Sequence, residues 1–269
     1  MTNLLSRRRA LMFAAPALFA LPALAEEAVH AAKPRPKAKP KGKAAPAAPA
    51  AEAHPPAAAA HHAAPSVPPE EALERLMSGN ARYVAGQSSH PNSSLARRAQ
   101  VAAAQAPFAV ILACADSRVA PELIFDQGLG DLFTVRVAGN VVDDAVLASI
   151  EYSVIHLGST LVMVLGHERC GAVRATADAL AGKGDPADQG TRIAALAGLI
   201  APAVRTVPPG AVDTVDAAIS LNAARTAQEI FAQSAPLRAR VLAGQLKIVA
   251  ARYDLDDGRV SPARGGPTA

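Results

Sequence analysis

The sequence predicts an α/β fold in which helices flank a central, mostly parallel β-sheet and an N-terminal helical arm precedes it. Short, continuous apolar runs mark buried strands, amphipathic stretches mark helices, and the two alternate along residues 69–258. This alternation favours parallel strands, because each connecting helix carries the chain back across the sheet. The 269 residues leave room for one such domain and a long N-terminal extension.

The first expected element is a helix over residues 70–85, whose apolar face holds Leu73, Leu76 and Met77. Buried strands are expected at residues 108–113, 132–137, 161–165 and 246–251. Further helices are expected at residues 144–156, 171–180, 187–204 and 211–234. Asp143 or Asp144 would cap the first of these, and residues 256–258 (Asp-Asp-Gly) indicate a hairpin turn.

Residues 1–25 are typical of an export signal. Three arginines at 7–9 precede an apolar stretch over 10–21, and Ala23-Leu24-Ala25 is a small-residue cleavage site. The alternative is a retained anchor, although the stretch is short for a membrane span and contains Pro16. The paired arginines suggest the twin-arginine route. We therefore expect a periplasmic or otherwise exported protein with no stable membrane span after signal removal.

Residues 26–68 are Ala/Pro-rich and basic, with lysines at 33, 37, 39, 41 and 43. This composition predicts a disordered linker that cannot bury a core. A solvated spacer is the simpler interpretation, and contact with anionic lipid or cell-wall polymer is the alternative. After the domain of residues 69–258, residues 259–269 are expected to form a flexible tail.

The positive charge of the chain lies outside the predicted domain. The whole chain has a net charge of +4, but residues 69–269 hold 18 Lys and Arg against 20 Asp and Glu. The chain has no tryptophan and 3% aromatic residues, which leaves few rings for base stacking. We therefore expect no nucleic-acid partner.

The only two cysteines, Cys114 and Cys170, lie beside other residues of metal-binding type. His167 precedes Cys170 by three positions, and both cysteine segments follow predicted strands. Because open α/β sheets build their sites at the carboxyl ends of strands, neighbouring strands could bring the two segments together. Two thiolates and one imidazole suit Zn²⁺, and three protein ligands leave a position open for water, as catalytic zinc requires.

Two other interpretations of these cysteines stay open. An oxidising compartment would permit a Cys114–Cys170 disulfide, which would leave His167 unexplained. A structural zinc would need a fourth protein ligand, for which Asp116 is the obvious candidate. Arg118 would hold Asp116 ionised and oriented, so that its carboxylate either accepts a hydrogen bond beside the metal or ligates the metal itself.

Cys114-Ala115-Asp116-Ser117-Arg118 together with His167-x-x-Cys170-Gly171 resembles the zinc signature of the β-class carbonic anhydrases. The resemblance covers roughly residues 70–258 and includes the stretches FDQGLGDLF (125–133), VRVAGN (135–140) and YDLDDG (253–258). It implies a β-carbonic-anhydrase-like fold and zinc-dependent reversible hydration of carbon dioxide to bicarbonate and a proton. Cys114, His167 and Cys170 would bind the zinc, and a hydroxide on the zinc, oriented by Asp116 and Arg118, would attack carbon dioxide.

The resemblance also implies a substrate pocket and an oligomer. Gln105 matches the family's polar pocket glutamine, and Phe133 and Tyr152 match apolar pocket positions that a neighbouring subunit often supplies. Tyr152 and His156 match a proton relay proposed in some members. Residues 70–106 resemble arms that family members pack across a partner, which implies a homodimer or homotetramer.

Alternative functions remain within the same architecture. Close relatives hydrolyse carbonyl sulfide or carbon disulfide, and a catalytically silent zinc- or bicarbonate-binding protein would keep Asp116 on the metal. In one subset of the family the counterpart of Asp116 ligates zinc and closes the site, and a tryptophan typically lines the bicarbonate pocket. The absence of tryptophan and the presence of Gln105 favour an open site.

Overall fold

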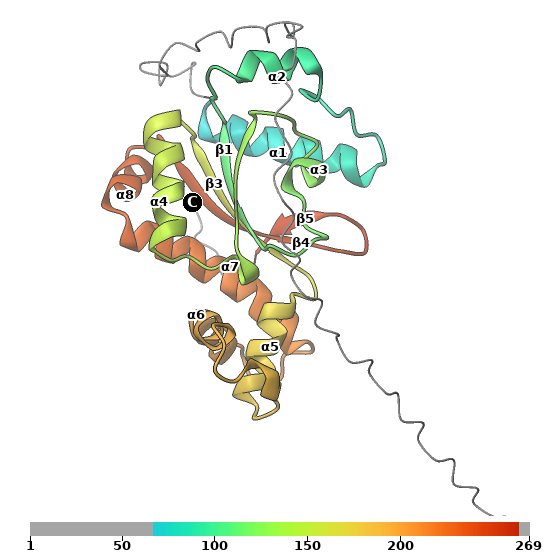
Figure 1. Ribbon diagram of the computed structural model, residues 1–269, viewed down its shortest axis with the longest axis vertical. Helices are drawn as coiled ribbons and strands as arrows, with labels where there is room; N and C mark the ends of the chain where they lie inside the picture. Colours follow the sequence, from blue (N-terminus) through green and yellow to red (C-terminus); the bar gives the residue numbers. More distant parts are fainter. Residues whose placement is uncertain (1–66, 264–269) are drawn as a thin grey trace, which may run out of the picture. The chain divides into compact units, whose positions relative to one another are not determined.

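Residues 67–263, the part of the chain that this computed structural model describes, contain a five-stranded sheet of order β2-β1-β3-β4-β5 (Figure 1). The strands are β1 (Ala109–Ala113), β2 (Leu132–Arg136), β3 (Leu161–His167), β4 (Lys247–Tyr253) and β5 (Val260–Pro262). The first four run parallel, and β5 pairs antiparallel with β4. The mostly parallel sheet is therefore confirmed, whereas the predicted signal and all but the last two residues of the predicted linker lie outside the described residues.

The helices follow the predicted order, and several boundaries differ. They are α1 (Pro69–Val84), α2 (Leu95–Val101), α3 (Pro121–Ile124), α4 (Asp144–Tyr152), α5 (Gly171–Leu180), α6 (Ile193–Arg205), α7 (Thr214–Gln233) and α8 (Ala235–Leu242). Short 3-10 turns occupy η1 (Ala138–Asn140) and η3 (Pro186–Asp188), and a π-helical turn, η2 (Ser153–Leu157), continues α4. Of the two candidate caps for α4, Asp143 is the one whose side chain accepts from the Val146 amide.

Two boundaries correct the sequence-based expectation. The helix expected over 187–204 begins only at Ile193, and the one expected over 211–234 is followed by α8, which we did not predict. Pro236 lies in the first turn of α8, where its missing N–H costs nothing, and Ser234 caps that turn by accepting from the Leu237 amide. The chain therefore starts a new helix instead of extending α7.

The sheet also continues past residue 258, where we expected the domain to end. β3 runs on to His167 and β4 to Tyr253, and these two residues pair in register. β5 then lies within the predicted tail and pairs with the last three residues of β4. The added antiparallel strand covers the backbone edge that β4 would otherwise expose.

Helices cover both faces of the central strands, which explains the continuous apolar runs in the sequence. Side chains of a strand alternate between the two faces of a sheet. Even-numbered residues of β1 and β3, such as Val110 and Val164, pack with α4, α7 and α8. Odd-numbered residues, such as Ile111 and Met163, pack with α1 and α3. Because β1 and β3 pair in parallel between these two helix layers, their carboxyl ends lie side by side.

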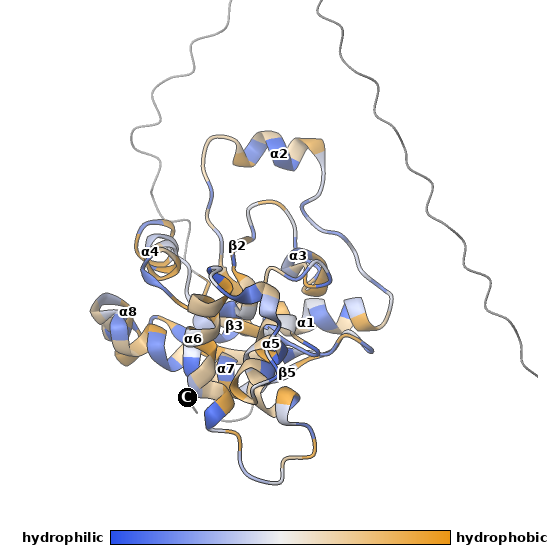
Figure 2. Cartoon of the chain, turned by 60° about the horizontal axis from the view of Figure 1, so that its bottom comes forward, coloured by the Kyte–Doolittle hydropathy of each residue, from blue (hydrophilic) through white to orange (hydrophobic). Residues whose placement is uncertain are grey.

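The predicted helical arm is present between α1 and β1. Its helix α2 has no buried residue and stands away from the sheet in Figure 2, with Leu95 exposed to 74%. Asp131 anchors its base, because Asn92 Nδ2 donates to both carboxylate oxygens at 2.9 and 2.8 Å. Arg97 Nη2 lies 3.3 Å from the same carboxylate. Within the described residues, α2 is thus held through Arg97 and the chain before it, and none of its residues is buried.

A second carboxylate, that of Asp126, joins the arm to α1. It accepts hydrogen bonds from Arg82 Nε at 2.6 Å, from the Ser89 amide at 3.0 Å and from the His90 amide at 2.8 Å. Burial alone would raise the pKa of Asp126, but these hydrogen bonds outweigh it and hold the pKa well below its usual range. The carboxylate is therefore ionised in the folded protein.

Asp126→Asn is expected to lower the free energy of unfolding at pH 7 by about 2 kcal/mol, because an amide nitrogen would face hydrogen-bond donors. A lowered folded-state pKa stabilises the fold above the unfolded value of about 4 and loses that effect as the pH falls through the folded-state pKa. The deficit of the variant should therefore shrink in acid. Urea unfolding at pH 7 and pH 3 measures both values, and an equal deficit at the two pH values would contradict the ionic role.

Candidate metal centre

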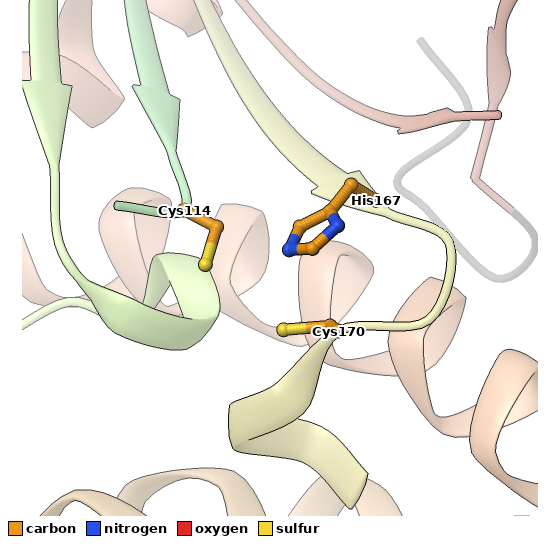
Figure 3. Close-up of side chains that lie close together, drawn as sticks. All are labelled: Cys114, His167 and Cys170. Carbon is orange, nitrogen blue, oxygen red and sulfur yellow. The ribbon is translucent and has the colours of Figure 1, made fainter. Parts of the chain in front are cut away.

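Three side chains of metal-binding type converge where β1 and β3 end (Figure 3). Cys114 directly follows β1, His167 is the last residue of β3, and Cys170 directly precedes α5 at its N-cap position. Their sulfur and nitrogen atoms all lie within 4.8 Å of one another. All three are buried, at 4%, 0% and 1% exposure respectively. The parallel pairing of β1 with β3 accounts for the meeting of two segments that are distant in the sequence.

The imidazole of His167 is oriented as a metal ligand. Its Nδ1 lies 2.9 Å from the backbone carbonyl of Glu168, so Nδ1 carries the proton and donates it there. Its Nε2 is buried and has no hydrogen-bond partner among the described residues. An unpaired buried nitrogen costs roughly 1–3 kcal/mol, and a metal ion between the two sulfurs would remove that cost. The residues present therefore fit zinc.

Both cysteines are free thiols, so the disulfide that the sequence left open is not formed. The hydrogen bond from the Cys170 thiol, assisted by His167 and by the backbone amide of Gly139, lowers the pKa of Cys114 to about 4 despite its burial. The same sharing of one proton raises the pKa of Cys170. These contacts favour the thiolate form at Cys114, which is the form that binds metal.

Two residues that hold Cys114 in place were missed by the sequence analysis. Gly139 donates its amide to Cys114 Sγ at 3.3 Å, and its carbonyl accepts from Asn222 Nδ2 at 2.7 Å. Gly139 has φ +71°, a conformation that favours glycine, and a Cβ there would lie 2.7 Å from Ile200 Cδ1 and would have to displace that side chain. Residues 135–140 were noticed as part of the resemblance, but no signal in the sequence connected Asn222 to them.

Asp116 and Arg118 form the expected pair beside the three ligands. Arg118 Nε and Nη2 donate to the two carboxylate oxygens of Asp116 at 2.9 and 2.8 Å, and the Arg118 amide adds a third bond at 3.0 Å. The side-chain hydrogen bonds from Arg118 hold the pKa of Asp116 well below its usual range. Asp116 Oδ2 lies 3.9 Å from His167 Nε2. The carboxylate is therefore ionised and adjacent to the metal-binding group.

Arg136, on the neighbouring strand β2, fixes the backbone of the same loop. It donates to the carbonyl of Cys114 at 3.1 Å and to that of Asp116 at 2.6 Å. Arg136 therefore holds the backbone after β1 at both Cys114 and Asp116. Arg136 was not among the predicted site residues.

The other predicted site residues lie elsewhere on the subunit. Phe133, Tyr152 and His156 form a row of rings, with centroids 6.3 Å apart for the first pair and 5.3 Å for the second. Gln105 is exposed in the loop between α2 and β1. Within residues 67–263, no hydrogen bond or ring contact joins any of these four to the three proposed ligands.

Comparisons with known proteins agree with this geometry. The carbonic anhydrase family matches residues 109–260, which include the three proposed ligands. Carbonic anhydrase 2 of Mycobacterium tuberculosis is 45% identical over 195 residues, covering 72% of this chain and 93% of the relative. The carbonic anhydrase of Mycolicibacterium smegmatis is 42% identical over 203 residues, covering 73% and 94%.

Solved structures with a similar fold are β-class carbonic anhydrases. A β-carbonic anhydrase of Coccomyxa has a TM-score of 0.52 and 26% identity, covering 71% of this chain and 83% of that one. A β-carbonic anhydrase of Sordaria macrospora, described as tetrameric, shares the fold with a TM-score of 0.56 and 22% identity, covering 70% and 93%. This chain belongs to the β-class carbonic anhydrases.

As a β-carbonic anhydrase, the chain is an enzyme that uses zinc and hydrates carbon dioxide. The zinc and the fold expected from the sequence are confirmed at this level. Within residues 67–263, none of the helices has both the length and the apolar character needed to cross a membrane.

Proposed function

We propose that this enzyme interconverts carbon dioxide with bicarbonate and a proton at a zinc ion held by Cys114, His167 and Cys170. One observation carries the assignment of these residues. The buried and unpartnered Nε2 of His167 lies within 4.8 Å of two sulfurs. Three ligands leave a fourth position for water, which distinguishes a catalytic zinc from a structural one.

The role of each residue follows from its contacts. Bound zinc lowers the pKa of a coordinated water and so supplies a nucleophile near neutral pH. Cys114, His167 and Cys170 would hold the metal. Asp116 is ionised by its pairing with Arg118, so it can only accept a hydrogen bond from the attacking water and thereby orients that water toward carbon dioxide.

We propose that the site is open, with Asp116 off the metal. Both carboxylate oxygens of Asp116 are engaged by Arg118, and Asp116 is not part of the group whose ligand atoms lie within 4.8 Å of one another. An acid that ligated zinc would have to give up one of these charge-assisted hydrogen bonds. The geometry therefore supports an enzyme that is active as folded.

We further propose that the pocket is completed in a homo-oligomer. Gln105 and the ring row of Phe133, Tyr152 and His156 do not contact the metal ligands of their own subunit, and α2 buries nothing. An arm that covers a partner would bury α2 and carry Gln105 toward the partner's site. Light scattering on the purified enzyme should give a dimer or a tetramer, and a monomer with full activity would refute the shared pocket.

We also propose that the protein is exported. This proposal rests on the sequence of residues 1–25, which lie outside the described part of the chain. The arginine pair would allow export after folding, so that zinc could be loaded before the thiols meet an oxidising compartment. Cell fractionation with detection of the shortened chain is the test, and full-length protein confined to the cytoplasm would overturn it.

Stopped-flow carbon dioxide hydration is the direct test of the proposed site. We expect activity that disappears when a chelator removes zinc and returns when zinc is added. Carbonyl sulfide and carbon disulfide serve as control substrates, and we expect no comparable turnover of either. Zinc-loaded enzyme without carbon dioxide hydration would contradict the proposal.

A further inference from the structure

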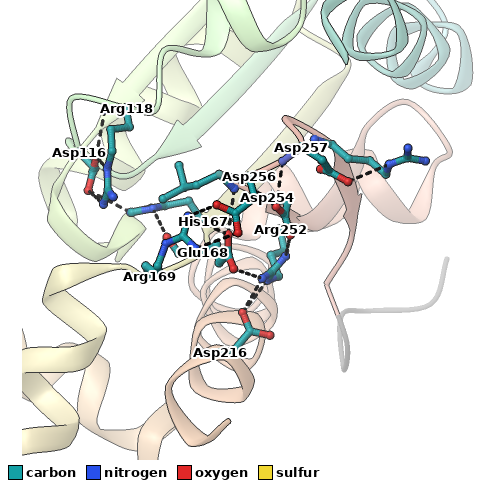
Figure 4. A network of polar contacts seen from close by, with 12 residues as sticks. Asp116, Arg118, His167, Glu168, Arg169, Asp216, Arg252, Asp254, Asp256 and Asp257 are labelled. Atoms are coloured by element: carbon teal, nitrogen blue, oxygen red, sulfur yellow. Dashed lines mark hydrogen bonds and ion pairs between the residues drawn. The ribbon is translucent and has the colours of Figure 1, made fainter. Parts of the chain in front are cut away.

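A network of charged side chains borders the His167–Cys170 turn on the side away from Asp116 (Figure 4). Its members are Glu168, Arg169, Asp216, Arg252, Asp254 and Asp256, from the metal-binding turn, the start of α7, the end of β4 and the hairpin before β5. Some of these residues also line a surface pocket of about 240 Å³. None of them has a role in the proposed chemistry.

Glu168 is the residue that connects this network to the metal centre. Its backbone carbonyl accepts the proton of His167 Nδ1 at 2.9 Å, and its own amide donates to the Tyr253 carbonyl at 2.9 Å. The carbonyl belongs to the Glu168–Arg169 peptide and the amide to the His167–Glu168 peptide, so the backbone on both sides of Glu168 is held. The orientation of the Glu168–Arg169 peptide determines which imidazole nitrogen faces the two sulfurs.

The side chain of Glu168 is held from three directions. The Leu255 amide donates to Oε2 at 3.1 Å. Arg252 Nη2 lies 3.7 Å from Oε1, and Arg169 Nη2 lies 3.5 Å from Oε2. The side chain is only 19% exposed, so the two arginines neutralise a carboxylate that is largely removed from water.

Both arginines are themselves fixed. Arg252 pairs with Asp216 at 2.7 Å and with Asp254 at 3.0 Å. Arg169 makes a two-bond pair with Asp256, at 2.9 and 2.6 Å. Arg169 also has φ +53°, a left-handed conformation that is unfavourable for a non-glycine residue. The pair with Asp256 helps to hold this strained residue between two metal ligands.

We propose that Glu168 is a positioning residue: its carboxylate, held by Arg252, Arg169 and the Leu255 amide, fixes the peptide that orients His167 for zinc. The inference rests on the proposed zinc site and adds a determinant of zinc affinity. Residues that orient a metal ligand typically contribute 10- to 100-fold to metal affinity. Glu168 would therefore change the zinc affinity without being a zinc ligand itself.

The test measures zinc affinity by competition with a chromophoric chelator, with no assay of activity. Glu168→Ala should raise the zinc Kd by about 10- to 100-fold. Glu168→Gln keeps an oxygen for the Leu255 amide but loses the charge facing the two arginines, so we expect a smaller rise, of roughly 3- to 10-fold. In the Co²⁺-substituted proteins, the thiolate and ligand-field absorption bands should shift in the same order.

Glu229→Ala is the matched control. Glu229 is a partly buried glutamate on α7 that pairs with Arg225 at 2.7 Å, and it has no contact with the metal-binding turn. Its removal should leave the zinc Kd and the Co²⁺ spectrum unchanged. A loss of thermal stability in both alanine variants with a change of zinc Kd in Glu168→Ala alone would separate positioning from general stabilisation.

The measurements distinguish a failure of the proposed zinc site from a failure of the positioning role of Glu168. If the wild-type enzyme binds no zinc, the proposed metal site itself fails. If the wild-type enzyme binds zinc and Glu168→Ala binds it equally well with an unchanged Co²⁺ spectrum, only the positioning role fails. If Glu168→Ala does not fold, Glu168→Gln decides in the same way, together with Asp256→Asn at a position whose side chain is 70% exposed.

Discussion

His167→Ala is expected to abolish both zinc retention and carbon dioxide hydration. The substitution leaves two sulfurs as the only protein ligands and opens a void where the imidazole is fully buried. Without the metal there is no group that lowers the pKa of water to near neutrality, so kcat/KM should fall by at least about a thousandfold. Metal analysis of the purified protein and stopped-flow kinetics measure the two effects.

A matched histidine substitution controls for general damage. His90 is exposed on the arm and has φ +47°, so His90→Asn suits that backbone conformation. We expect His90→Asn to keep one zinc per subunit and nearly full kcat/KM. Retention of zinc and activity by His167→Ala, with the fold intact by circular dichroism, would remove His167 from the metal site.

Asp116→Asn is expected to lower kcat/KM by about 100-fold or more while zinc content stays unchanged. The amide keeps the size of the carboxylate but is neutral, and it can present a donor where the attacking water needs an acceptor. It also loses the charge that pairs with Arg118. Because the substitution acts on orientation at the open position, the loss should fall mainly on kcat.

The pH dependence of the same variant gives a second readout. The pKa of Asp116 is held well below its usual range, so the wild-type carboxylate stays ionised throughout the neutral and mildly acidic range. Loss of wild-type activity toward pH 6 should therefore reflect the coordinated water and not Asp116, and Asp116→Asn should keep the same midpoint at a lower plateau. Asp185→Asn, at a cap where asparagine also accepts from the Ala187 amide, is the control and should match the wild type.

The sequence predicted the strands and the principal helices well, because their signal is local. Apolar runs of five to seven residues and helical periodicity depend on neighbours in the chain. The missed start of α8 has a local cause, the cap at Ser234, whereas the missed strand β5 depends on a contact with a distant segment. β5 exists because β4 offers an unpaired edge, and residues 260–262 (Val-Ser-Pro) carry no apolar run that would mark a strand.

For the candidate site, too, some residues could be predicted from local sequence and others could not. The identities of Cys114, His167, Cys170, Asp116 and Arg118 could be read from two short motifs, since catalytic zinc requires particular ligand types at close spacing. By contrast, Gln105 and the Phe133–Tyr152–His156 row came from resemblance alone, and the single subunit does not bring them to the metal ligands. Their roles remain predictions.

The sequence by itself therefore determined the ligand set, the adjacent acid–arginine pair and the fold class, all of which reside in local patterns. Only the tertiary structure decided how the ligands are held. Asn222 reaches Gly139 across 83 residues, and the Leu255 amide reaches Glu168 across 87. These contacts arise because parallel strands place the ends of distant segments at one edge of the sheet, and no periodicity along the chain records that neighbourhood.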